Sequence, residues 1–126
     1  MIPSQEEAKE HTSVLEAAAD AARRTPGVAY LRPGFGDLVR GAAVRYRSRD
    51  DQTPAAHRIA GVRAQRTDPP RGWNLRIHLA VARGHRALDV TREVRTAVTE
   101  AVRDLAAASG APEPRVSVTI TVTDIA

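Results

Sequence analysis

With 126 residues, the chain is long enough for one hydrophobic core but not for two, and without cysteine it has neither a disulfide framework nor a thiolate metal site. No stretch comes near the roughly 20 apolar residues that a membrane-spanning helix needs, and residues 1–11 are polar and acidic, unlike a secretory signal. We therefore expect a soluble cytoplasmic protein. Because only 3% of the residues are aromatic, its core should consist mainly of small aliphatic side chains.

The positive charge is concentrated in the middle of the chain. The net charge is +4, but residues 32–86 alone carry +8, whereas residues 1–31 and 87–126 carry −2 each. A basic segment attracts phosphate groups of nucleic acid or lipid. The alternative is that these arginines are solvated side chains on strands and loops, where each contributes little.

The first predicted element is a helix from Ser4 to Arg24. Ser4 is a suitable N-cap, and Glu7 follows at the spacing of a capping box. Pro26 and Gly27 should end the helix. Its apolar stripe is expected to consist of Ala8, His11, Leu15, Ala18 and Ala22.

The middle of the chain predicts strands and turns. Residues 27–31 read as a short strand, residues 32–36 as a loop, and residues 41–48 as an arginine-decorated strand that would suit a sheet edge. Residues 58–67 alternate around small apolar side chains and predict one further strand. The turn sequence of residues 67–72 should join this strand to the next as a hairpin.

The last third carries the strongest patterns. Residues 73–83 alternate with five apolar side chains on one face, which predicts a strand with a buried face and a wetter face. A helix should follow, with Asp89 or Thr91 as its N-cap and Gly110 as its end. The final strand is predicted by the alternation of residues 116–123. The apolar positions of the helix are Val90, Val94, Ala97, Val98, Ala101, Val102 and Leu105.

These elements together predict an α+β fold in a single domain over residues 1–126. Two helices should pack on one face of a mostly antiparallel sheet of about four strands, in the order α-β-β-β-α-β, with one further strand in the basic middle.

The sequence provides no recognisable catalytic set. Its serines lack a nucleophile-elbow context, its four histidines lack metal-ligand spacing, and Asp50 and Asp51 fall in a predicted loop. We therefore predict no catalytic residues, no metal, no cofactor and no small-molecule substrate. The candidate interaction surface consists of the arginines of the middle segment: Arg40, Arg45, Arg47, Arg58, Arg63 and Arg76.

Binding of nucleic acid is the alternative function that this charge favours. The aromatic residues near the arginines are Tyr30, Tyr46 and Trp73, and no GXXG loop is present. A KH domain needs that loop, and an RRM needs aromatic residues on its central strands. The arginines are therefore the only feature of the sequence that favours nucleic acid.

Four short motifs, taken in order, resemble one family. They are Pro26-Gly27-Val28 after the first helix, the alternating run 75–81, the helical run 94–98, and the closing run 118–125. This order is similar to that of the alkaline shock protein (Asp/Gls-type) envelope stress response family of Gram-positive bacteria, and this chain looks like an actinobacterial member. The resemblance covers most of residues 12–32 and 73–126. Residues 33–72 depart from it, with an arginine- and proline-rich connection.

The resemblance implies a non-enzymatic protein of the envelope stress response. It implies a cytoplasmic homo-oligomer, an alkaline-shock-type domain over residues 1–126, and attachment at the membrane through a small membrane-anchoring protein. The family has no catalytic residues, so the resemblance assigns none to this chain.

Overall fold

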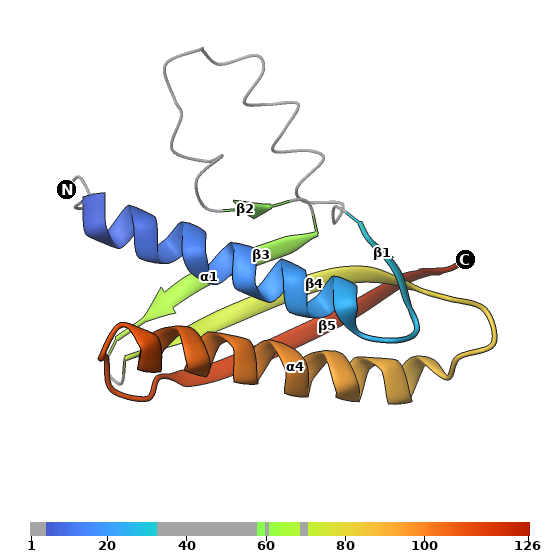
Figure 1. Ribbon diagram of the computed structural model, residues 1–126. Helices are drawn as coiled ribbons and strands as arrows, with labels where there is room; N and C mark the ends of the chain where they lie inside the picture. The colour runs from blue at the N-terminus through green and yellow to red at the C-terminus, as the bar shows by residue number, and fades with distance from the viewer. Residues whose placement is uncertain (1–4, 33–57, 60, 69–70) are drawn as a thin grey trace, which may run out of the picture.

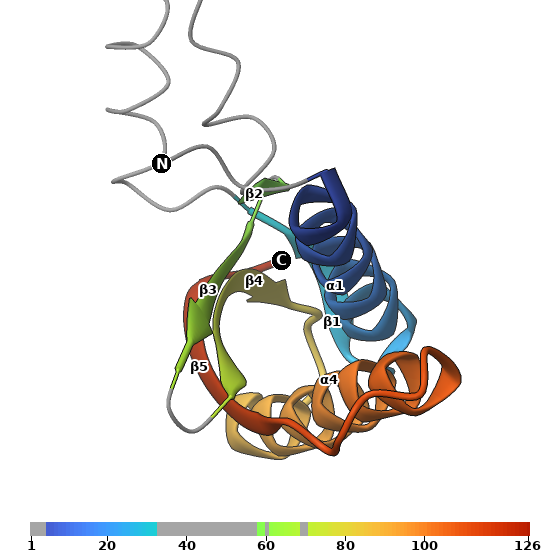
Figure 2. The same ribbon diagram turned by 90° about the vertical axis from the view of Figure 1, so that its left-hand side faces the viewer.

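The computed structural model describes residues 5–32, 58–59, 61–68 and 71–126, and it confirms the small α+β fold. Both helices lie on the same side of the sheet (Figure 1), and the sheet curves around that side (Figure 2). The predicted arrangement, two helices on one face of a mostly antiparallel sheet, is thus confirmed. The elements are α1 (Gln5–Arg24), β1 (Val28–Leu31), β2 (Arg58–Ile59), β3 (Val62–Thr67), β4 (Gly72–Val81), α4 (Ala87–Ala108) and β5 (Arg115–Ile125).

Strand β4 is the centre of the sheet. Along one edge it pairs with β5 in parallel, from Gly72 opposite Arg115 to Val81 opposite Ile125. Along the other edge it pairs antiparallel with β3 and then with β1, and β2 pairs with the far side of β3. The β4–β5 pair is parallel because α4 carries the chain back to the end at which β4 begins, as a crossover helix does.

The core lies between β4 and the two helices. The predicted apolar face of β4, from Trp73 to Val81 in steps of two, is buried. In α4, four valines one turn apart are at most 2% exposed, and they form the stripe that faces the sheet. Valine lowers helix propensity, so packing against the sheet must hold this helix in place. The four valines are Val90, Val94, Val98 and Val102.

The structure corrects the strand predicted over residues 58–67. This run forms two antiparallel strands, β2 and β3, because the chain reverses at Gly61, whose φ is +84°. A Cβ atom there would lie 2.9 Å from the backbone nitrogen of Arg32, so the turn needs glycine for space as well as for conformation. The predicted hairpin with the following strand is confirmed by the β3–β4 pairing.

The predicted N-cap of α4 is also wrong. The helix begins at Ala87 with Arg86 as its N-cap, and no side chain caps it. Asp89 lies within the first turn, where its negative charge favours the helix dipole, and the Thr91 hydroxyl donates to the Leu88 carbonyl at 2.9 Å. The end of α4 matches the prediction, since the helix stops at Ala108 shortly before Gly110, whose φ is +74°.

Other predictions lie outside the described residues. These are the Ser4 N-cap, the strand over residues 41–48, and three of the six candidate arginines, Arg40, Arg45 and Arg47. They stay predictions.

Candidate interaction surface

The side of the sheet away from the helices is polar. Alternate residues of β3, β4 and β5 point to this side, and the register places them in neighbouring rows. Six of the eight are exposed, and the other two, Arg63 and His78, are half-buried. We call this set the polar sheet face, and it contains two arginines and no carboxylate. Its residues are Arg63, Gln65, Asn74, Arg76, His78, Ser117, Thr119 and Thr121.

Two of the predicted arginines occupy opposite positions on neighbouring strands at the centre of this face. Arg63 lies directly opposite Arg76, and Arg76 lies directly opposite Thr119 on its other side. Arg58 lies opposite Arg63 in β2. The structure therefore brings three of the six predicted positions, 58, 63 and 76, into adjacent places on three strands.

One end of the polar side is closed by a cluster around Asp124. A register shift between Leu79 and Ala80 places Asp124 opposite Ala80. The Tyr30 hydroxyl donates to Oδ2 of Asp124 at 3.4 Å, and Arg32 forms an ion pair with the same atom at 3.3 Å. Tyr30 lies opposite Ala80 on the other edge of β4. This arrangement accounts for the complete burial of Ala80 on the otherwise wet face of β4.

A second cluster joins α1 to the β3–β4 hairpin. Glu10 accepts from Arg66 at 2.6 Å on one carboxylate oxygen and from Arg71 at 2.9 Å on the other. The Arg66 guanidinium lies 5.7 Å from the centre of the Trp73 ring, within the range of a cation–π contact. His11 meets the same ring edge-on at 5.4 Å.

These two clusters show that part of the positive charge of the basic middle segment is neutralised within the protein. Three of its arginines form ion pairs with acids of the two acidic flanks, Arg66 and Arg71 with Glu10 and Arg32 with Asp124. These ion pairs join segments that are distant in the sequence. They lie at partly exposed sites, where each contributes about 1 kcal/mol or less. Arg76 lies outside both clusters, exposed on the polar sheet face.

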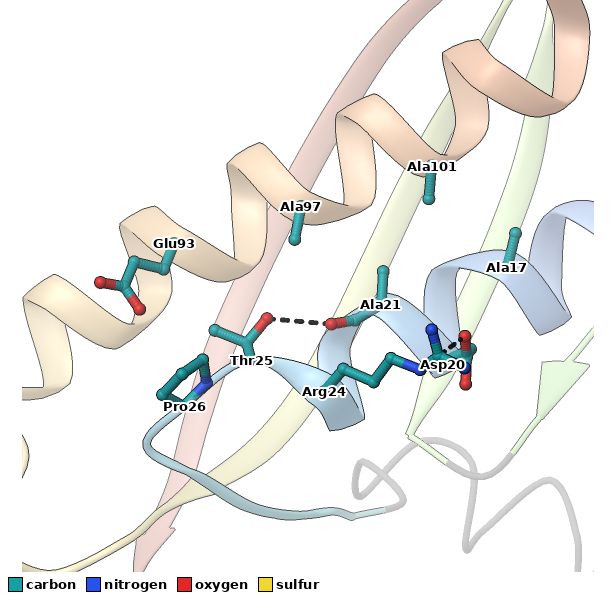
Figure 3. Close-up of a pocket in the computed structure, with 9 residues that line it drawn as sticks. All are labelled: Ala17, Asp20, Ala21, Arg24, Thr25, Pro26, Glu93, Ala97 and Ala101. Atoms are coloured by element: carbon teal, nitrogen blue, oxygen red, sulfur yellow. Dashed lines mark hydrogen bonds and ion pairs between the residues drawn. The ribbon is translucent and has the colours of Figure 1, made fainter.

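A groove of about 460 Å³ lies between the two helices. Ala17 and Ala21 of α1 face Ala97 and Ala101 of α4 across it, as Figure 3 shows. Three of the polar residues that line it already have partners. Asp20 forms an ion pair with Arg24 at 3.2 Å, and the Thr25 hydroxyl donates to the Ala21 carbonyl at 2.9 Å. The residues that line the groove do not bring a nucleophile and a base together, so its shape and chemistry fit contact with an apolar side chain.

The described part of the chain holds neither a metal-binding group nor a membrane-spanning helix. In that part of the chain, no group of three histidine or acidic side chains could hold a metal ion, and neither helix is long and apolar enough to cross a membrane. Comparisons of the chain with protein-family models, with curated proteins and with solved structures find no significant match.

Proposed function

We propose that this chain is a non-enzymatic interaction module that associates with copies of itself and acts in the envelope stress response. The observation that carries the proposal is the order of the four family-like motifs. In chain order they occupy the turn from α1 into β1, then β4, α4 and β5. The surface supports an interaction role, because the polar sheet face is broad and spans three strands.

We further propose that the protein acts in the cytoplasm, at the inner face of the membrane, and that a small membrane-anchoring protein holds it there. The family resemblance supports this attachment. The exposed outer side of α4 alternates Arg92 and Arg95 with Glu93 and Glu100 and would give little attraction to an anionic bilayer.

The self-association is tested on the purified full chain by size-exclusion chromatography with light scattering over a range of concentrations. We expect a mass of at least twice the 13.6 kDa of one chain. A mass of 13.6 kDa at every concentration would contradict the proposal. In the same preparation we expect no co-sedimentation with protein-free phosphatidylcholine vesicles, and tight binding to them would contradict attachment through a partner.

Nucleic-acid binding is the second candidate function, and the observation that favours it is the exposed Arg76 on the polar sheet face. The register places Arg76 between Arg63 on one side and Thr119 on the other, on a face whose eight residues include no carboxylate. A phosphate group there would accept hydrogen bonds from Arg76 and from the Thr119 hydroxyl. Phosphate contacts of this kind make binding strongly dependent on salt.

The variant Arg76→Gln tests this second function, with Arg92→Gln on the exposed side of α4 as the matched control. If the face binds single-stranded RNA, Arg76→Gln should weaken binding several-fold and lower the salt slope by about 0.7, as expected for one lost phosphate contact. Arg92→Gln should change neither quantity. Fluorescence anisotropy at several salt concentrations measures both. Equal effects of the two variants, or no binding by the unmodified chain at low salt, would rule the function out.

A further inference from the structure

Strand β5 has a long edge that no other described strand pairs with. Among the described strands it pairs with β4 alone, over its whole length. The Arg115 amide donates to the Arg71 carbonyl at 3.1 Å, so Arg115 turns its backbone groups toward the β4 side. In a parallel ladder, alternate residues turn both their N–H and their C=O to the same neighbour. The residues between them therefore direct their backbone groups to the free edge, and these are Val116, Val118, Ile120 and Val122.

This edge lacks the features that keep sheet edges from pairing. Natural edge strands are kept short, or are interrupted by proline, by charged residues or by bulges. Residues 116–122 contain no charge, no proline and no glycine. The register shift of β5 lies beyond this stretch, between Val122 and Asp124. By contrast, β2 has only two residues. Among the described residues, the free edge of β5 is thus open for the addition of a strand.

The edge is complementary to itself in the antiparallel direction. With Thr119 opposite its own copy, Val116 meets Val122 and Val118 meets Ile120. All four of these residues turn their backbone groups outward, so four pairs with two bonds each give about eight hydrogen bonds. Val116, Ile120 and Val122 are only half-buried on the helix side of the sheet, and the partner's aliphatic side chains would cover part of what remains exposed.

The end residues favour the same direction. β5 begins with Arg115 and ends near Asp124. Antiparallel pairing places each Arg115 opposite the partner's Thr123 and next to the partner's Asp124, which brings opposite charges together. Parallel pairing would place the two Arg115 side chains side by side, and like charges at that distance repel.

We infer that two copies of this chain pair through the antiparallel edges of β5, with the two-fold axis at Thr119, and form one continuous sheet. The polar sheet faces of the two copies then lie on the same side and merge across the axis. This inference rests on the proposed self-association and identifies the surface that carries it.

A single cysteine tests the inference, because the chain contains none of its own. Thr119 would face its copy in a pair without hydrogen bonds, where the Cα atoms are about 4.5 Å apart and a disulfide fits. We therefore expect Thr119→Cys to form a covalent dimer under mild oxidation. In the matched control Thr121→Cys, the two sulfurs would be separated by four residues of strand, more than 10 Å. Both positions are exposed on the same face, so both variants should fold.

The measurement is non-reducing gel electrophoresis, together with light scattering of the unmodified chain. We expect most of the Thr119→Cys variant and less than about a tenth as much of the Thr121→Cys variant to be cross-linked. If the unmodified chain self-associates and the two variants cross-link equally, or neither does, the β5 interface is wrong while the proposed self-association stands. If the unmodified chain stays monomeric, both are wrong.

Discussion

Replacement of Leu79 by alanine is expected to destabilise the protein by about 2–5 kcal/mol. Leu79 is completely buried in β4, between Leu31 of β1 and Val122 of β5, at the point where the curved sheet meets the helices. The core consists mainly of valine and alanine, so each of its few leucines fills a large share of the volume. Removing three carbon atoms there costs their transfer free energy and leaves a cavity that the sheet cannot close.

Leu88→Ala is the matched control for this substitution. Leu88 lies in the first turn of α4, and 61% of its surface is exposed, so the same change should alter the free energy of unfolding by no more than about 0.5 kcal/mol. Urea denaturation followed by circular dichroism measures both variants. A Leu79→Ala effect no larger than that of Leu88→Ala would mean that β4 is not the centre of the core.

The core could be predicted from the sequence because its signals are local and repeated. The alternation from Trp73 to Val81 and the four-residue spacing from Val90 to Val102 both mark buried faces without knowledge of the partners. If either element turned its other face to the core, it would bury polar groups and expose several apolar ones. Strong periodicity therefore leaves one arrangement for each element, and the structure has that arrangement.

The ion pairs and the register shift could not be predicted, because they depend on contacts between segments that are distant in the sequence. Glu10 binds Arg66 and Arg71, which follow it by 56 and 61 residues, and nothing in either segment indicates the other. Asp124 is two residues after Val122, so the alternation of β5 would place it on the apolar face. The register shift instead places it opposite Ala80 and beside Tyr30. Such shifts follow from the curvature and pairing of the whole sheet.

The candidate surface could be predicted in part. The hairpin signal between β3 and β4 is local, and it places Arg63 opposite Arg76 once the register is known. The total charge of the middle segment is a poorer guide, because Arg32, Arg66 and Arg71 form ion pairs with acids of the flanking segments. A basic segment identifies a binding face only after such internal pairs are set aside.

Gly27 is expected to be the position where the smallest side chain has a large effect. Its φ is +93°, a conformation that costs an alanine about 1–2 kcal/mol. A Cβ atom there would also lie 2.5 Å from Cγ2 of Val90 and 2.9 Å from Nδ1 of His85. Overpacking of this kind typically costs a further 1–3 kcal/mol. Gly27→Ala should therefore destabilise the protein by about 2–5 kcal/mol in total.

Gly84→Ala separates these two costs. Gly84 has nearly the same φ, +90°, but no atom lies within 4 Å of the position of its Cβ atom. The variant should show the backbone cost alone, about 1–2 kcal/mol. Thermal or urea denaturation of both variants gives the difference, which isolates the close contact between the α1–β1 turn and the beginning of α4. Equal destabilisation by the two variants would show that this contact adapts to a methyl group, and that backbone conformation alone requires glycine after Pro26.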